Sequence, residues 1–99
     1  MRVIKKYVEG ISEELEDAKE YAERYVECKA KGNINAANRY KEMASDELKH
    51  AMYLHEFTVK EIDEISRVYT PPVEMQKKWE LEHKKFVEET ALVKQILAS

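Results

Sequence analysis

Residues 47–50, Glu-Leu-Lys-His, lie in the middle of the longest helical pattern of the chain, and a related motif returns at residues 80–83, Glu-Leu-Glu-His. A Glu and a His three positions apart lie on one face of an α-helix, about one turn from each other. That spacing allows one carboxylate and one imidazole to reach the same metal ion. The two motifs therefore predict a helical bundle that holds a metal site between its helices.

Three helical patterns contain or flank these motifs. Apolar residues recur every three or four positions in each pattern, which indicates amphipathic helices. We expect helices over residues 3–31, 34–69 and 71–98. The connections are short, so successive helices should be antiparallel neighbours. The sequence predicts an all-α fold with a single domain over residues 1–99, built as a bundle of three long helices.

Turn signals separate the three patterns. Gly32 can adopt the left-handed conformation that ends a helix, and Asn33 can cap the helix that follows. Thr70 is expected to cap the third helix, because the two prolines after it fit only a first turn. Gly10 weakens the first helix by about 1 kcal/mol relative to Ala. The helix could therefore bend there, or begin at Ser12 as an alternative cap.

The composition narrows the class of protein. Charged residues make up 37% of the 99 positions and apolar residues 43%, as expected for long helices. The net charge is -3 and basic residues alternate with acidic ones, so no nucleic-acid surface is expected. Cys28 is the only cysteine, which favours a reducing compartment. No signal peptide or membrane span is apparent, and we expect a cytoplasmic protein without a membrane partner.

Both Glu-x-x-His motifs fall on lines of residues that we expect to face inward. In the second helix this line contains Tyr40, Met43, Glu47, His50, Leu54, Phe57, Glu61, Ile65 and Val68. In the third helix it contains Val73, Gln76, Trp79 or Glu80, His83, Phe86 or Val87, Thr90, Val93 and Leu97. A charge on an apolar face is costly unless it is paired or binds a metal. The alternative is that two partly exposed pairs arise by chance, since 17 residues are Glu.

The first helix should donate a further carboxylate to the same centre. On a 3.6-residue period Glu14 shares a face with Ile11, Ala18 and Tyr21, and Asp17 is the second choice. The predicted ligands are Glu14, Glu47, His50, Glu80 and His83. Three carboxylates with two imidazoles suit one or two ions of iron or manganese, with zinc as a further option.

The positions of four other side chains also suggest their roles. Tyr21 and Tyr25 could hydrogen-bond a ligand carboxylate or could simply pack at the edge of the core. His55 lies five positions after His50 and off its face, so we expect it at the surface. Trp79 is expected to anchor the core or a dimer interface.

The series Glu14, Tyr21, Glu47 and His50 resembles the ferritin-like superfamily of rubrerythrins, manganese catalases and ferritins. In the rubrerythrin-type pattern a first-helix Glu precedes a Tyr by seven residues, and the second helix carries Glu-x-x-His. Over residues 9–95 the chain is similar to short bacterial and phage-borne ferritin-like proteins. Those proteins also have three helices and carry an acid-x-x-His motif on the last one.

The resemblance implies a metal-binding function but leaves one helix missing, because a complete ferritin-like bundle has four. Either three helices form a reduced site, or two chains associate to complete it, as in encapsulated ferritins. A homo-oligomer, and a bound metal that reacts with dioxygen or peroxide, are what the resemblance implies. The competing hypothesis is a helical interaction protein of phage or mobile-element origin, in which any metal is structural or absent.

Overall fold

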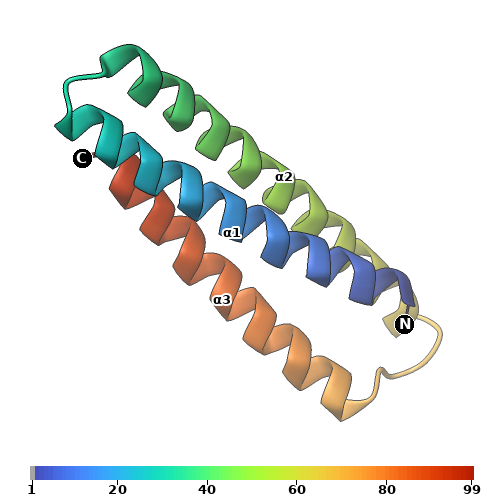
Figure 1. The fold of residues 1–99 in the computed structure, drawn as a ribbon. Coiled ribbons are helices and arrows are strands. Elements are labelled where there is room, and N and C mark those ends of the chain that lie inside the picture. The colour runs from blue at the N-terminus through green and yellow to red at the C-terminus, as the bar shows by residue number, and fades with distance from the viewer. Residues whose placement is uncertain (1) are drawn as a thin grey trace.

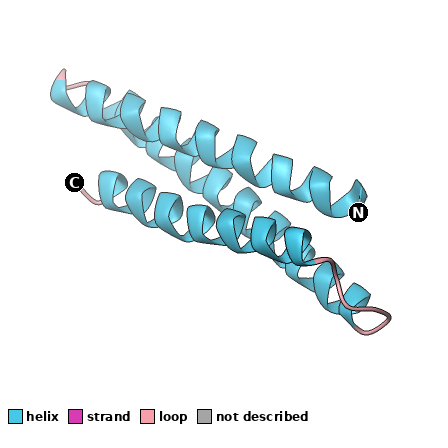
Figure 2. Cartoon of the chain, turned by 90° about the horizontal axis from the view of Figure 1, so that it is seen from below, coloured by secondary structure: helices cyan, strands magenta, loops and turns pink. Residues whose placement is uncertain are grey.

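The computed structural model describes residues 2–99 and contains three antiparallel helices, as the sequence predicts. They are α1 (Arg2–Ala30), α2 (Ile34–Ser66) and α3 (Val73–Leu97). The molecule is a rod of 56 × 17 × 17 Å, with α1 between α2 and α3 in the view of Figure 1. Figure 2 shows that the loops are confined to the ends of the rod. None of the helices within residues 2–99 combines the length and the apolar composition of a membrane span.

The turn between α1 and α2 forms as predicted. Gly32 has a φ of 79°, and the backbone N–H of Asn33 donates to the carbonyl of Cys28 at 2.9 Å. This hydrogen bond, with that from Gly32 to Lys29, satisfies the last carbonyls of α1. The Asn33 side chain accepts a hydrogen bond from the N–H of Ala36 at 3.2 Å and so caps α2.

The turn between α2 and α3 differs from the prediction. The cap residue of α3 is Pro72, which makes no side-chain capping bond, and Thr70 lies outside the helix. Thr70 and Pro71 each precede a proline, and that neighbour disfavours helical backbone angles at both positions. The first helical residue is therefore Val73.

The first helix runs through Gly10 without interruption, so Ser12 does not begin a helix. Position 10 faces the Leu54 side chain of α2. A Cβ atom on Gly10 would lie 2.9 Å from the Cδ1 atom of Leu54, which packs over this position from α2. The missing side chain makes room for that contact.

The core lies mainly between α1 and α2 and is rich in alanine. Its buried residues on these helices are Ile11, Leu15, Ala18, Ala22, Tyr25, Ala37, Ala44, Leu48 and Ala51. Three of the alanines on α2 recur every seven residues, close to two helical turns. Small side chains at the contact allow two helices to pack close together.

The inward line predicted for α2 is therefore rotated about the helix axis. Met43 and Phe57, both expected to face inward, are 40% and 51% exposed, whereas Ala44, Leu48 and Ala51 are buried. Ala44 follows Met43 by one position, which is a rotation of about 100°. Alanines contribute little to a hydrophobic pattern, and this is why sequence periodicity placed the larger side chains inward.

The third helix is the most exposed of the three. Only Val93 and Leu97 are buried along it, and Trp79 and Phe86 are partly buried. The chain end is fixed to α1, because the Ser99 carbonyl accepts hydrogen bonds from the Tyr25 hydroxyl at 3.0 Å and the Lys29 ammonium at 2.7 Å. The half of α3 that carries Glu80 and His83 contains no fully buried residue.

Candidate metal centre

Three of the predicted ligands converge between α1 and α2. Glu14 of α1 and Glu47 and His50 of α2 each offer a ligand atom, and these atoms all lie within 4.8 Å of one another. The His50 Nδ1 atom is 3.5 Å from Oε2 of Glu14 and 3.8 Å from Oε1 of Glu47. The one-turn spacing in α2 and the antiparallel register opposite α1 bring the three together.

The carboxylates of this group are more buried than the imidazole. The side chains of Glu14 and Glu47 are 27% and 20% exposed, and that of His50 is 54% exposed. The Oε2 atom of Glu14 is fully buried and has no hydrogen-bond partner. The Nδ1 atom of His50, at 3.5 Å, is near enough for an ion pair but lacks hydrogen-bond geometry. A buried carboxylate oxygen without a donor is costly, and a cation would compensate it.

Aromatic pairs lie on both sides of the centre along the same helix pair. Tyr7 and Phe57 have ring centroids 5.8 Å apart, and Tyr21 and Tyr40 stack at 6.3 Å. On α1, Glu14 is seven residues from each of the two tyrosines, so all three share one face. Tyr21 therefore lies on the same face of α1 as Glu14, while the Tyr25 hydroxyl donates a hydrogen bond to the Ser99 carbonyl, as described above.

The other two predicted ligands do not join this group. Glu80 is exposed on α3, and the His83 Nδ1 atom lies 2.8 Å from Nε2 of His55. The α3 helix contacts α2 on a different face. The five positions from His50 to His55 correspond to one full turn of the helix and about 140° more, so the two imidazoles point in different directions. Asp17, the alternative ligand on α1, is exposed and outside the group.

Sequence reasoning missed the environment of His55, which is half-buried rather than on the surface. Its ring stacks on Phe86 at 4.3 Å and lies 5.1 Å from Trp79. Burial lowers the pKa of His55, and the neighbouring His83 lowers it further. The spacing of Trp79, Phe86 and Val93 by seven residues marks the packed face of α3 and could have indicated this contact.

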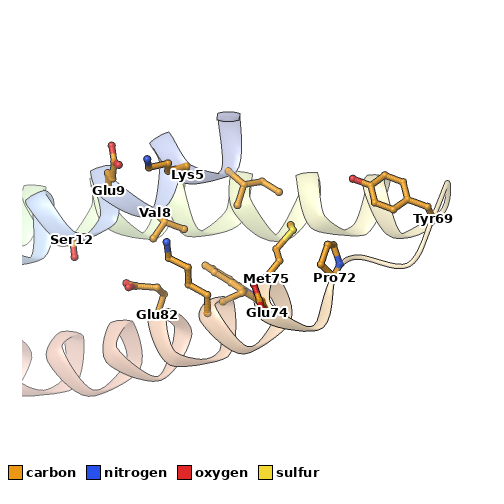
Figure 3. A pocket seen from close by; sticks show the side chains of 12 residues that line it. Lys5, Val8, Glu9, Ser12, Tyr69, Pro72, Glu74, Met75 and Glu82 are labelled. Atoms are coloured by element: carbon orange, nitrogen blue, oxygen red, sulfur yellow. The ribbon is translucent and has the colours of Figure 1, made fainter. Parts of the chain in front are cut away.

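A separate hollow of about 750 Å³ lies between α1 and α3, near the turn that leads into α3. Lys5 and Val8 line it from α1, and Met75 and Glu82 line it from α3 (Figure 3). Its rim carries charges of both signs, and none of the three converging ligands lines it. The hollow is therefore independent of the candidate metal centre.

Comparisons with known proteins do not assign the chain to a family. No protein-family model matches the sequence, and neither a curated protein nor a solved structure matches it. The geometry of the three ligands therefore carries the functional interpretation.

Proposed function

We propose that this protein binds iron or manganese through Glu14, Glu47 and His50, in the manner of the ferritin-like proteins that its sequence resembles. The observation that supports this most is the convergence of the three side chains from two helices around a buried, unpartnered carboxylate oxygen. Two carboxylates and one imidazole form a donor set in which hard oxygen predominates. Such a set suits manganese and iron, and zinc is a weaker fit.

One chain supplies three ligand residues, and we infer that a second copy supplies three more. The α2 residues that border the groove shared with α3 are Lys41, Ser45, Leu48, Lys49 and Met52. His50 lies about 200° from Leu48 around the helix, so the ligand face is turned away from α3. Met43 and Phe57, each seven residues from His50, leave large apolar surfaces exposed on that face.

Symmetry supports this arrangement. In a two-fold dimer the same face of each chain contacts the other. The pairing of two α1–α2 units would form a four-helix bundle with two Glu14 residues and two Glu47-x-x-His50 motifs. A lone Glu on two helices and a Glu-x-x-His on the other two is the ligand set of dinuclear ferritin-like centres. In this arrangement α3 would lie outside the bundle.

Each of the three residues has its own role in the proposed site. The carboxylates of Glu14 and Glu47 neutralise the charge of the ion and favour its higher oxidation state, and the His50 imidazole fixes its position. Bound iron or manganese would supply redox chemistry toward dioxygen or peroxide. The half-exposed His50 ring lies at the open side of the group, where the second copy would approach.

Metal analysis tests the proposal. The protein is loaded anaerobically with ferrous iron or with Mn²⁺, desalted and analysed for bound metal. We expect about one ion per chain, as two ions shared between two chains require. The variants Glu14→Gln and His50→Ala should lose this metal, and Glu13→Gln, an exposed neighbour, should keep it. Wild-type protein that retains less than about a tenth of an equivalent would contradict the proposal.

A further inference from the structure

The contact between α2 and α3 contains a pair of histidines that the proposed function does not use. The His55 Nε2 atom and the His83 Nδ1 atom are 2.8 Å apart, and the ring centroids are 5.0 Å apart. One imidazole donates a proton to the lone pair of the other in this arrangement. Two ring nitrogens from different helices thus face each other at hydrogen-bond distance.

The surroundings of the pair are apolar on one side and open on the other. The His55 ring is half-buried and packs between Phe86 and Trp79, and the Trp79 ring also lies 6.1 Å from that of His83. His83 itself is exposed. The aromatic rings restrict the orientation of His55, while the open side leaves room for water ligands.

We propose that His55 and His83 form a second metal site, which takes a late first-row divalent ion such as Zn²⁺, Ni²⁺ or Cu²⁺ and ties α3 to α2. Imidazole nitrogen is a preferred ligand of these ions. The site differs from the first centre in that it has no carboxylate among its proposed ligands. It is independent of the proposed function, because it shares no residue with Glu14, Glu47 and His50.

The distance between the two nitrogens is close to what a shared ion needs. With metal–nitrogen bonds of about 2.0–2.1 Å, two nitrogens are about 2.9 Å apart at a right angle and about 3.4 Å apart in a tetrahedron. Starting from 2.8 Å, the two nitrogens must separate by a few tenths of an ångström, and each ring must turn so that its lone pair points at the ion and not at the other ring. The ion takes the place of the shared proton, which moves to the other ring nitrogen of the imidazole that donated it, so that neutral imidazoles release no net proton.

The position of the pair gives the site a structural consequence. The α2 and α3 helices pack less closely than the other two helix pairs, and the buried residues of α3 lie near its C-terminal end. An ion held by both histidines would fix the N-terminal half of α3 against α2. Binding to the folded state alone raises stability by mass action.

The single tryptophan of the chain provides a local readout. Trp79 lies beside both imidazoles, so that Cu²⁺ or Ni²⁺ bound between them should quench its fluorescence. Metal-free protein is titrated with Ni²⁺, and the ion concentration at half-maximal quenching is measured. The variants are His55→Gln and His83→Gln, and the matched control is His50→Ala, which removes the third histidine and leaves the pair intact.

We expect wild type and His50→Ala to quench at the same Ni²⁺ concentration and each variant of the pair to need at least ~10-fold more. In a second measurement, made in His50→Ala so that the first centre does not take the ion, Zn²⁺ should raise the melting temperature. It should not raise that of the double variant His50→Ala/His83→Gln, whose second substitution is at an exposed position. Quenching of His83→Gln at the wild-type Ni²⁺ concentration, or an equal Zn²⁺ shift in the double variant, would overturn the second site. Loss of iron or manganese from the first centre would not affect either result.

Discussion

At the scale of single residues, the Oε2 atom of Glu14 affects both the stability of the fold and the metal binding that we propose. This oxygen is buried without a donor, next to the carboxylate of Glu47. A protein without a metal function would gain stability by replacing it. We expect a neutral side chain at this position to suit the metal-free structure better than the carboxylate does.

We therefore predict that Glu14→Gln stabilises the metal-free protein while it weakens metal binding. Removal of a buried charge whose Oε2 atom accepts no hydrogen bond should raise the free energy of unfolding by about 1 kcal/mol. Urea unfolding in the presence of a chelator measures this change. Glu13→Gln, at an exposed position, is the control and should have no effect. A metal-free Glu14→Gln protein that unfolds at lower urea than wild type would count against this interpretation.

His55 predicts a pH dependence of stability. The pKa of its imidazole lies below 6.5 in the folded chain, first because of burial and then because of His83, while Glu56 acts in the opposite direction. The unfolded chain therefore takes up the proton first as the pH falls. The contribution of His55 is complete above pH 6.5 and is lost progressively below it.

Urea midpoints measured about one unit above and about one unit below pH 6.5 test this pH dependence. Wild type should lose more stability between the two conditions than His55→Gln does. Chelator is present throughout, so that metal binding at either site does not contribute. Equal losses in the two proteins would show that His55 does not titrate as its surroundings require.

At the scale of the elements, the alanines set how closely α1 and α2 approach. Ala18, Ala22, Ala44 and Ala51 are completely buried. The same close approach brings Glu14 within reach of Glu47 and His50. We infer that the helix contact and the metal centre depend on the same small side chains.

Replacing one of these alanines with a larger residue should disrupt both the contact between α1 and α2 and the metal centre. We predict that Ala44→Leu destabilises the protein by about 1–3 kcal/mol, because the added side chain has no space between the helices. Ala91→Leu introduces the same side chain at an exposed position of α3 and should change stability by less than about 0.5 kcal/mol. Thermal and urea unfolding compare the two variants. Similar stability of both would show that α1 and α2 are not tightly packed at Ala44.

The elements also show how much the sequence could predict. Gly32 and Asn33 act within one turn, so the end of α1 and the start of α2 followed from local chemistry. The rotation of α2 about its axis did not follow from local chemistry, because it depends on which face of α2 fits α1 most closely. The alanines on that face contribute little to the hydrophobic pattern of the sequence. The convergence of Glu14 with the motif at 47–50 was predictable from helical spacing and antiparallel order.

The position of α3 was the part that the sequence left open. Its motif at 80–83 matches the spacing of the motif in α2, and Trp79 and Glu80 were equally compatible with an inward face. The structure packs Trp79 and Phe86 inward, which leaves Glu80 exposed and directs His83 to His55. Local spacing predicts which residues share a face of one helix, but the neighbour that this face meets depends on tertiary packing.

At the scale of the whole molecule, two faces of the α1–α2 pair have different neighbours. One face is partly covered by α3, and the other carries the three ligands together with exposed Met43 and Phe57. The three-helix chain thus resembles half of a four-helix centre with an additional helix on its outside. In the proposed dimer the second copy would supply the other two helices of the bundle.

The most direct test of this account is anomalous X-ray scattering from crystals of the protein loaded with manganese, recorded near the manganese absorption edge. We expect a strong peak bonded to Glu14, Glu47 and His50, with the same three residues of a symmetry-related copy completing the ligand set. Manganese peaks away from these residues, or a ligand face covered by solvent and without a peak in fully loaded crystals, would contradict it.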